Sequence, residues 1–314
     1  MTVVSEQAPE RAAEIPAYRA FHVRVLRTAR LSPSFVRITF GGEELSGFAD
    51  NGFDQRIKLI LPLPGDRFTP LGDGADWYQQ WRALPVELRN PIRTYTVRAV
   101  RPGQGELDVD FVLHGDTGPA SRWAIHAAPG HRIIVVGPNT ACPGPTGGQE
   151  WAPPARAAHL LLAGDETAVP AISCIAESLP GDVRATVLLE VPRAADALPL
   201  NVRPDVRVTW LPREAGRHGD LLIPAVRDAL GEITAAGGRC PASPESTALL
   251  EDVDIDGEIL WEVPHAPDGG LYAWLAGEAG MVKLLRRHLV QEAGIDRSSV
   301  AFMGYWRLGR SETG

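Results

Sequence analysis

The sequence predicts two domains of different class, an antiparallel β-barrel followed by an α/β domain built on a parallel sheet. In the first half, short β-rich segments follow one another with turn residues between them and no long helix, a pattern typical of a barrel. In the second half, strands alternate with helical segments, which indicates a parallel sheet with helices on both faces. The chain of 314 residues is long enough for one domain of each kind.

Six strands are expected in the first domain, which we place at residues 18–136. Each is rich in β-branched or aromatic residues, and Gly and Pro pairs stand between several of them. The expected strands are Phe21–Thr28, Val36–Gly41, Gln55–Leu61, Arg93–Val100, Glu106–Val112 and Arg132–Val136. Residues 1–17 are rich in Glu, Ala and Pro and are predicted to form a disordered lead-in.

A Pro- and Gly-rich linker at residues 137–157 separates this barrel from an α/β domain at residues 158–314. The expected strands are His159–Ala163, Arg184–Val191, Val206–Trp210, Leu271–Ala276 and Val300–Tyr305, and the helices Thr167–Leu179, Leu221–Leu230 and Met281–Ala293. Residues 231–264, with Gly, Pro, Ser and several acids, are interpreted as an insertion that forms a mobile loop or a short hairpin ending at Ile259–Val263. We assign this insertion no function.

Composition narrows the class of protein. A net charge of −8 without any basic stretch argues against a nucleic-acid partner. The three cysteines form no C-x-x-C pair, so neither a disulfide framework nor a zinc site is indicated, and no His, Cys and carboxylate cluster suggests another metal. The N-terminus does not resemble a signal peptide, and no apolar run approaches the ~20 residues that span a bilayer. We expect a cytoplasmic monomer.

The segment Arg93–Arg98 carries the first functional candidates. In a strand, alternate side chains share a face, so Arg93, Tyr95 and Val97 lie on one side and Thr94 and Thr96 on the other. The guanidinium and the phenol ring would then lie about 7 Å apart. This pair suits a cofactor with an anionic tail and a flat aromatic head. The alternative is an ordinary amphipathic strand.

A second candidate follows a dozen residues later. The strand Asp110–Gly115 runs into Asp116–Ala124, where a Gly-Pro turn opens a helix. Such an arrangement presents backbone N–H groups to a phosphate.

The same motif occurs twice in the α/β half: a strand is followed by Ala-Gly-acid and then by a helix, at Ala163–Asp165 and at Ala276–Glu278. Ligands of open α/β sheets bind at the carboxyl ends of the strands, so both turns are candidates for a nicotinamide dinucleotide. The G-x-G-x-x-G fingerprint is absent, which does not support a standard Rossmann site. The acids suit ribose hydroxyls or the nicotinamide amide better than a pyrophosphate. They could also be simple helix N-terminal acids.

Glu190 ends the second strand of the α/β half, where an acid accepts hydrogen bonds from an adenosine ribose and disfavours a 2′-phosphate. Arg193, three residues on, could do the opposite. The sequence therefore leans slightly to NADH over NADPH.

These stretches, together with Leu162–Ala168, Leu275–Glu278 and Gly304–Arg307, resemble the siderophore-interacting proteins. This family comprises FAD-dependent ferric-siderophore reductases of the ferredoxin-reductase superfamily. The resemblance covers roughly residues 20–309, with the motifs in the family's order.

The resemblance implies that FAD binds to the barrel and NADH or NADPH to the α/β domain. Arg93 would neutralise the flavin phosphate, Tyr95 would stack on the ring and Thr96 would approach N5, so Tyr95 and Thr96 are the catalytic candidates. Strict alternation points Thr96 away from Tyr95, so its contact requires the backbone or a bent strand. Further cofactor-binding candidates are Val97, His114, Gly118, Ala120 and Ser121 for FAD, and Asp165, Thr167, Ala168, Glu190 and Glu278 for the nicotinamide cofactor. His114 could equally be structural.

Two further residues are interpreted through the resemblance. Lys58 lies on a strand whose alternation puts it beside Arg56 and opposite Ile57, and it would contact an anionic ferric siderophore as substrate. The alternative is a solvated strand face. Trp306 follows the closing strand and would lie near the exposed flavin face, or it could be a packing tryptophan that seals the domain edge.

The implied function is transfer of electrons from NAD(P)H through FAD to a ferric siderophore, which releases Fe(II) for iron assimilation. A flavin suits this reaction because a nicotinamide gives up two electrons as hydride, whereas Fe(III) accepts one. One alternative is a general NAD(P)H:flavin oxidoreductase or an electron donor to a protein partner. Another, of a different class, is a flavin-bearing siderophore-binding protein without turnover.

Overall fold

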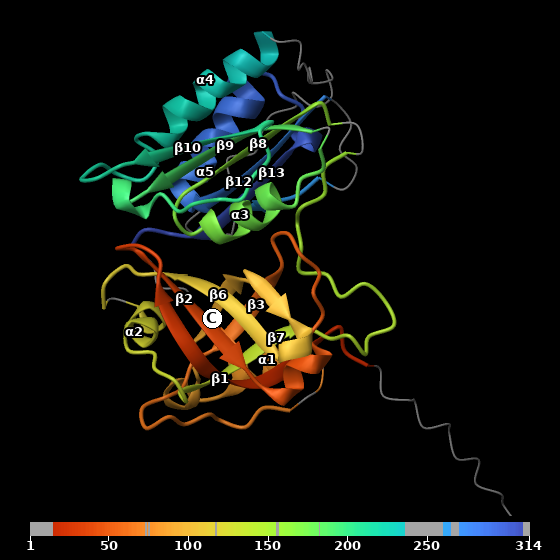
Figure 1. The fold of residues 1–314 in the computed structure, drawn as a ribbon, viewed down its shortest axis with the longest axis vertical. Coiled ribbons are helices and arrows are strands. Elements are labelled where there is room, and N and C mark those ends of the chain that lie inside the picture. The colour runs from red at the N-terminus through yellow and green to blue at the C-terminus, as the bar shows by residue number, and fades with distance from the viewer. Residues whose placement is uncertain are drawn as a thin grey trace, which may run out of the picture.

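The computed structural model describes residues 15–309, apart from positions 73, 75, 117, 155–156, 182, 236–259 and 265–269. It has two stacked units, a curled β-sheet and an α/β domain, as predicted (Figure 1). The predicted lead-in at residues 1–17 and the predicted insertion at residues 231–264 lie largely outside the described residues.

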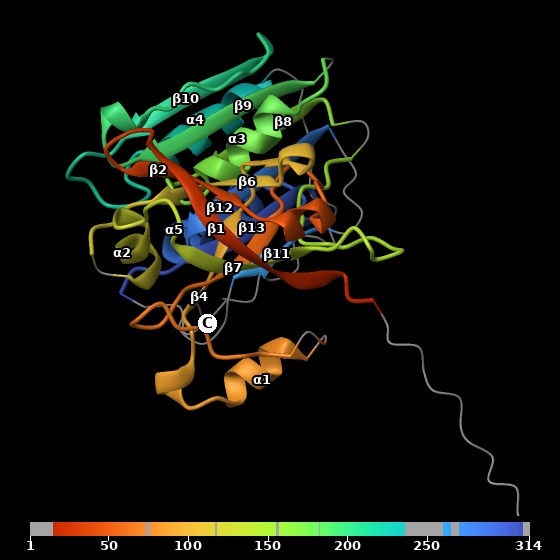
Figure 2. The ribbon, with the colours of Figure 1, turned by 60° about the horizontal axis from the view of Figure 1, so that its bottom comes forward.

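The barrel is a seven-stranded antiparallel sheet with the order β4-β3-β7-β1-β2-β6-β5. Its strands are β1 (Tyr18–Arg30), β2 (Phe35–Gly41), β3 (Arg56–Ile60), β4 (Ile92–Thr96), β5 (Ala99–Arg101), β6 (Glu106–Val112) and β7 (Arg132–Pro138). Two helices accompany the sheet, α1 (Trp77–Ala83) and α2 (Pro119–Ile125). Helix α1 lies on the side of the barrel away from the α/β domain (Figure 2).

The prediction of a single strand at Arg93–Val100 is wrong, because the structure divides this segment into β4 and β5. The chain changes its pairing partner between two adjacent residues. The backbone N–H of Val97 donates to Gln55 at 2.9 Å, and that of Arg98 donates to Asp108 at 2.9 Å. Since β4 and β5 are the two edges of the sheet, this change of partner curls the sheet into a barrel.

The α/β domain contains a six-stranded sheet with the order β10-β9-β8-β12-β13-β11, parallel except for β11. Its strands are β8 (His159–Gly164), β9 (Arg184–Val191), β10 (Val206–Pro212), β11 (Trp261–Glu262), β12 (Leu271–Glu278) and β13 (Val300–Trp306). Its helices are α3 (Val169–Glu177), α4 (Leu222–Ala235) and α5 (Ala279–Arg286), which continues as a π-helical turn (Arg287–Glu292). The predicted fold class is confirmed.

Alternation along the buried strands explains why helices cover both faces of this sheet. On β8, Leu160 and Leu162 pack in the cluster that contains α3, whereas Leu161 and Ala163 pack in the cluster that contains α4 and α5. A strand that is buried on both faces reads as a continuous apolar run, as this one does. Helix α3 lies on the face toward the barrel, and α4 and α5 lie on the far face (Figure 1).

The core beneath α3 continues into the barrel. Phe35 at the start of β2 and Val112 at the end of β6 are paired in register and belong to the same buried cluster as α3. An ion pair joins the units nearby, where Arg98 contacts Glu177 of α3 at 2.8 Å. The two units therefore share apolar core as well as surface contacts. Within the described part of the chain, no helix is both long and apolar enough to cross a membrane.

This shared core can be tested with Phe35→Ala. The Phe35 side chain has no exposed surface, so its truncation should lower the free energy of unfolding by about 3–5 kcal/mol, measured by urea denaturation. The control is Val86→Ala, at a side chain that is 75% exposed, where the change should stay within about 0.5 kcal/mol. Equal effects of the two substitutions would contradict the proposed packing role of Phe35.

Candidate functional site

A buried carboxylate organises the carboxyl edge of the α/β sheet. Asp165, directly after β8, has no exposed surface, and four donors bond to its two oxygens. Oδ1 accepts from the backbone N–H and the hydroxyl of Thr167, at 2.9 and 2.5 Å. Oδ2 accepts from the backbone N–H of Glu278 at 2.7 Å and from the indole N–H of Trp306 at 2.9 Å. Asp165 thus connects the ends of β8, β12 and β13.

Gly277 allows this close approach. Its φ is +144°, and a Cβ at this position would lie 2.7 Å from Asp165 Cγ, so no larger residue fits without displacing the carboxylate. Burial raises the pKa of Asp165 to about 6, and the neighbouring charge of Glu166 adds to that rise.

Glu166, the next residue, is also fully buried, but basic side chains surround it. Arg213, just after β10, donates two hydrogen bonds of 2.6 Å to its two oxygens. The Nε2 atom of His218 lies 3.2 Å from Oε1, and Nδ1 of His114 lies 3.8 Å from the same oxygen. Burial pushes the pKa of Glu166 upward, but the hydrogen bonds of His218 and Arg213 outweigh it and lower that pKa to about 2.

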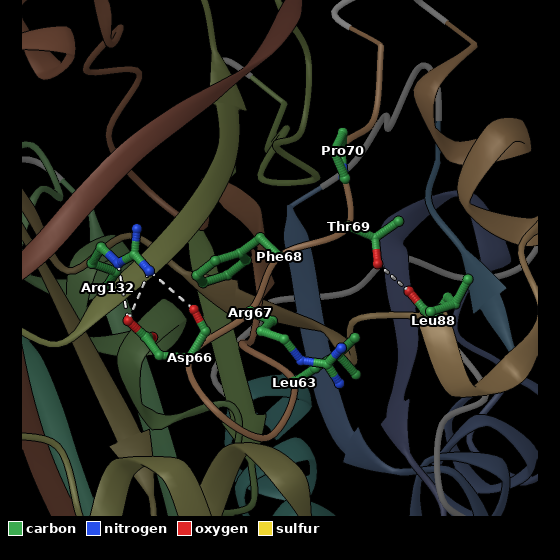
Figure 3. Close-up of a pocket in the computed structure, with 8 residues that line it drawn as sticks. All are labelled: Leu63, Asp66, Arg67, Phe68, Thr69, Pro70, Leu88 and Arg132. Carbon is green, nitrogen blue, oxygen red and sulfur yellow. Dashed lines mark hydrogen bonds and ion pairs between the residues drawn. The ribbon is translucent and has the colours of Figure 1, made fainter.

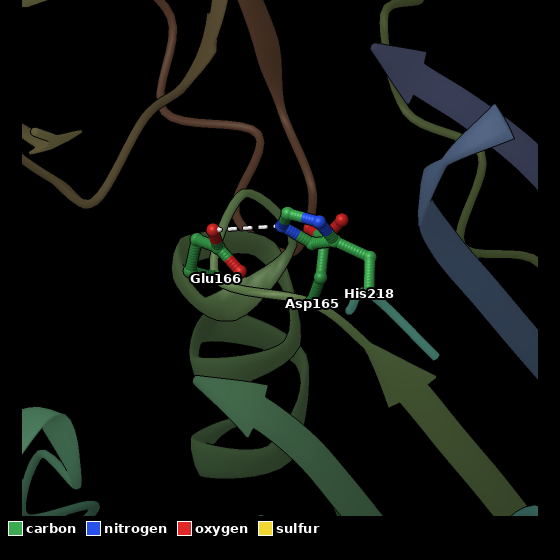
Figure 4. A group of neighbouring side chains, drawn as sticks. All are labelled: Asp165, Glu166 and His218. Atoms are coloured by element: carbon green, nitrogen blue, oxygen red, sulfur yellow. Dashed lines mark hydrogen bonds and ion pairs between the residues drawn. The ribbon is translucent and has the colours of Figure 1, made fainter. Parts of the chain in front are cut away.

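Asp165, Glu166 and His218 bring three potential metal-ligand atoms within 4.8 Å of one another (Figure 4). This cluster was not expected from the sequence, because His218 lies 52 residues from Glu166 along the chain. The existing bonds make it a poor cation site. Arg213 neutralises both oxygens of Glu166, and four hydrogen bonds occupy Asp165. The arrangement fits a hydrogen-bonded charge network better than a metal centre.

Trp306 lies where the barrel meets this network. Its ring stands perpendicular to that of His218, with centroids 4.8 Å apart, and its centroid is 5.8 Å from that of His114. His114 follows β6 of the barrel, and burial lowers its pKa although the charge of Glu166 acts in the opposite direction. The structure therefore brings three predicted site residues, His114, Asp165 and Trp306, to one point between the domains.

The predicted flavin strand lies beside β6. Arg93 and Tyr95 stand opposite Leu59 and Ile57 of β3, and the Tyr95 ring packs on Phe111 with centroids 4.4 Å apart. Leu59 and Ile57 are buried in the barrel core, so Arg93 and Tyr95 share the face that alternation predicts. Thr96 and Val97 are both buried.

The loop after β6 has the chemistry that a phosphate needs. Helix α2 follows its N-cap residue Gly118, which has no side chain to accept a hydrogen bond from the first turn. Backbone N–H groups of that turn, such as that of Ala120, are suited to an anion. Ser121 stabilises the loop, because its hydroxyl accepts from the His114 N–H at 3.1 Å and donates to the Gly115 carbonyl at 2.6 Å. These features fit a dinucleotide such as FAD, which the barrel is predicted to bind.

The other predicted residues have different surroundings. Ala168 is buried, and its backbone N–H donates to the Asp165 carbonyl at 3.0 Å. Glu278 caps α5 by accepting from the Met281 N–H at 2.8 Å. Lys58 donates to the Thr94 hydroxyl at 2.7 Å and lies on the face of the β3–β4 pair opposite to Tyr95. The predicted ligand contacts of these residues stay predictions.

Glu190 is fully buried and holds the start of α4. Its oxygens accept from the backbone N–H groups of Gly219, Leu221 and Leu222, at 2.8, 3.1 and 2.8 Å. In this conformation the carboxylate faces the helix, whereas Arg193 is exposed after the same strand. The predicted contact between Glu190 and a ribose stays a prediction, and its main observed role is structural.

A pocket of about 510 Å³ lies on the barrel, between the chain after β3 and the start of β7 (Figure 3). Arg132 closes one side through an ion pair with Asp66 at 2.9 Å. The lining residues are Leu63, Asp66, Arg67, Phe68, Thr69, Pro70, Leu88 and Arg132. None of the predicted site residues lines this pocket.

Comparison with known proteins agrees with this architecture. A family model described as a siderophore-interacting FAD-binding domain matches residues 24–142, and one described as a siderophore-interacting protein matches residues 157–309. The crystal structure of the siderophore-interacting protein SipS from Aeromonas hydrophila is 31% identical, with a TM-score of 0.64 and 95% of each chain covered. The chain belongs to the siderophore-interacting protein family.

Other relatives support the same assignment. A siderophore utilization protein from T. fusca is 28% identical, with a TM-score of 0.70 over 97% of this chain and 99% of that one. Ferric vibriobactin reductase ViuB of Vibrio cholerae is 28% identical over 91% of this chain and 89% of its own. The NADPH-dependent ferric-chelate reductase of Escherichia coli is 36% identical over 49% of this chain and 55% of its own. A ferredoxin reductase of carbazole 1,9a-dioxygenase, 14% identical with a TM-score of 0.58, shares the fold.

Sequence reasoning missed Arg213 and His218. Both follow β10 on the carboxyl edge of the parallel sheet, where ligands of such sheets bind. The strand expected at Val206–Trp210 extends to Pro212 in the structure, so its end lies next to Arg213. A rule that examined every strand end for charged residues would have found this arginine.

His218 provides a test of the network through pH. Burial alone would lower its pKa, but the hydrogen bond and charge of Glu166 raise it. Because the folded-state pKa is raised, this contribution to stability is complete below the unfolded value of about 6.5 and is lost as pH rises through the folded value. The loss of unfolding free energy in His218→Asn should therefore be larger at acid than at alkaline pH.

Urea denaturation across this pH range measures the difference. In a Glu166→Gln background most of the pH dependence should disappear, because the charge that raises the His218 pKa is gone. A loss in His218→Asn that does not vary with pH would contradict the assigned coupling.

Proposed function

We propose that this protein passes electrons from NAD(P)H through FAD to a ferric siderophore, and that Fe(II) is released for iron assimilation. The observation that carries the proposal is the meeting of the two predicted cofactor sites. His114, at the loop suited to the flavin, lies beside Trp306 and Glu166 on the edge suited to the nicotinamide. Hydride transfer needs such contact between the two sites. Membership of the siderophore-interacting family supports the choice of acceptor.

When bound, FAD would supply the conversion between a two-electron donor and a one-electron acceptor. In the proposal, Arg93 neutralises a flavin phosphate, and the backbone around Gly118, Ala120 and Ser121 binds the pyrophosphate. Tyr95 packs on the flavin ring, and Thr96 with Val97 approaches it through the backbone. Trp306 shields the exposed face of the ring.

On the opposite side, the carboxyl edge around Asp165, Thr167 and Glu278 orients the nicotinamide. Arg213 and His218 hold the adjacent Glu166 charge in place, so the edge does not repel an anionic cofactor as strongly as its acids suggest. We propose no preference between the two coenzymes. Glu190, the residue that favours NADH in the sequence, has its carboxylate buried against α4, and Arg193 is the exposed charge after that strand.

Lys58 is proposed to contact the anionic ferric siderophore as substrate. The two alternative functions keep the same fold. A general flavin reductase, or an electron donor to a protein partner, would reduce many acceptors without preference for siderophores. A siderophore-binding protein without turnover would keep its flavin oxidised in the presence of NAD(P)H.

Visible spectroscopy of the purified protein under anaerobic conditions separates these functions. The proposal expects a yellow protein whose flavin is bleached by NADH or NADPH and recovers its colour when a ferric siderophore is added, with Fe(II) trapped by a ferrous chelator. Recovery with free flavin or quinones but not with ferric siderophores would favour the general reductase. A colourless protein that takes up no FAD would overturn the proposal.

Arg93→Ala tests the flavin site. Loss of a charge-assisted hydrogen bond should cost about 1.5–3 kcal/mol of FAD binding, which is a roughly 10–150-fold rise in the dissociation constant measured by fluorescence titration. The control is Arg184→Ala, at the exposed first residue of β9 in the α/β domain. FAD affinity should not change in this variant. Equal FAD affinity in wild type and Arg93→Ala would exclude the phosphate role.

Trp306→Ala tests whether this side chain covers the flavin. If it does, the flavin spectrum and the rate of flavin reduction should change while stability falls little, because Trp306 is only half-buried. A packing role predicts instead a loss of about 3–5 kcal/mol with an unchanged spectrum. Trp306→Phe keeps a ring but removes the indole N–H that bonds to Asp165, and so separates shielding from that hydrogen bond.

A further inference from the structure

Asp196 makes a further contact between the two domains, away from the hydrogen-bonded charge network around Asp165 and Glu166. It ends the short 3-10 turn Ala194–Asp196 after β9 and has no exposed surface. Both of its oxygens accept hydrogen bonds from the β1–β2 turn of the barrel. Oδ1 accepts from the Ser32 hydroxyl at 2.6 Å and the Ser34 N–H at 2.7 Å, and Oδ2 accepts from the Ser34 hydroxyl at 2.8 Å.

The geometry of this contact fixes orientation as well as distance. Charge-assisted hydrogen bonds are short and directional, and three of them reach both carboxylate oxygens from a single turn. Oδ2 also accepts from the backbone N–H of Arg193 at 3.1 Å, so the carboxylate cannot rotate without breaking a bond on either side. The turn of one domain is therefore held at a set angle to the loop of the other.

Both sides of this contact lie next to segments that are predicted to bind a cofactor. The carbonyl of Ser34 accepts from the N–H of Leu113 at 2.8 Å, and Leu113 immediately precedes His114 and the loop suited to the flavin phosphates. On the other side, Asp196 follows the carboxyl end of β9, on the edge suited to the nicotinamide cofactor. The contact joins the two segments whose relative placement sets the separation of flavin and nicotinamide.

We propose that Asp196 is a positioning residue for hydride transfer, which acts by holding the flavin loop of the barrel at a set angle to the nicotinamide edge of the α/β domain. This inference rests on the proposed function. Hydride transfer is sensitive to displacements of the reacting atoms by about 1 Å. A loosened contact should therefore slow flavin reduction while each cofactor still binds to its own domain.

The test uses the full chain loaded with FAD, in three forms. Asp196→Asn removes the charge, and Ser32→Ala with Ser34→Ala removes both hydroxyl donors from the barrel without changing the α/β domain. The control is Asp296→Asn. Asp296 accepts from the N–H and hydroxyl of Ser298 at 2.8 and 2.7 Å, which is the same chemistry within one domain.

Anaerobic stopped-flow measurement of flavin reduction by NADH and NADPH should show a fall of about tenfold or more in the limiting rate for Asp196→Asn and for the serine pair, as expected for a misplacement of reacting groups. The concentration of coenzyme at half-saturation and the dissociation constant for FAD should stay within about twofold of wild type. Reoxidation by ferricyanide, which needs no nicotinamide, should not change. The control should match wild type in every measurement.

Hydrogen exchange on the FAD-free protein gives a readout that does not depend on activity. The amides of Ser34 and Arg193, which donate to Asp196, and that of Leu113 should exchange faster in both variants, while amides inside β3 and β12 keep their protection. If Asp196→Asn does not fold, the serine pair decides the matter. The proposal would be overturned if the serine double variant reduced its flavin at the wild-type rate and kept wild-type amide protection. Loss of FAD binding in that variant would also overturn it, because the β1–β2 turn would then be needed for the barrel itself.

The two proposals fail in different ways. A wild-type protein whose flavin accepts hydride but reduces no ferric siderophore would refute the proposed function and leave the role of Asp196 supported or refuted by the rate of flavin reduction. If the wild-type protein binds no FAD, hydrogen exchange alone tests the role of Asp196. Unchanged protection of the Ser34, Arg193 and Leu113 amides in both variants would then overturn the proposal.

Discussion

The candidate site depends on one hydrogen-bonded carboxylate that has been removed from water. Asp165 accepts from donors on three segments, at the ends of β8, β12 and β13, so three strand ends that are far apart in sequence share one acceptor. A buried acid without partners would be costly, and each donor offsets part of that cost. Glu166 beside it is compensated differently, by Arg213 and His218. Two adjacent acids thus differ in how their charge is balanced: hydrogen-bond donors surround Asp165, whereas Arg213 and His218 surround Glu166. Both lie at the edge of the α/β sheet that faces the barrel.

The contact between the domains combines apolar and polar parts. Phe35 and Val112 extend the core of the α/β domain into the barrel, which resists separation but does not set an angle, because apolar contacts are not directional. The polar contacts supply the direction. Arg98 pairs with Glu177 on one side, and Asp196 accepts from the β1–β2 turn on another. A reaction between cofactors bound to separate domains requires both properties at once.

Much of the fold follows from local patterns in the sequence. The strand Arg184–Val191 and the burial of β8 on both faces are apparent from residue type alone, because a parallel strand that is buried on both faces has a continuous apolar sequence. The division of β4 from β5 is not apparent, since Val97 and Arg98 change partners only because Gln55 and Asp108 lie on different strands. In the site, Asp165 and Trp306 were expected near the cofactors from their motifs. Their direct hydrogen bond, and the approach of Arg213 and His218 to Glu166, depend on contacts between distant segments.

The pairing of β1 with β7 has a consequence for how this protein is made. These strands join Tyr18 to Pro138, so the middle of the barrel cannot close until almost half of the chain has left the ribosome. Contacts of such long sequence separation slow folding, because the loop between them must be ordered first. Arg93 and Tyr95 are translated well before that closure, yet they reach their final geometry only after it. A nascent chain would therefore gain its affinity for FAD only after Pro138 has emerged. Before that point there is no closed barrel for the cofactor to bind and stabilise.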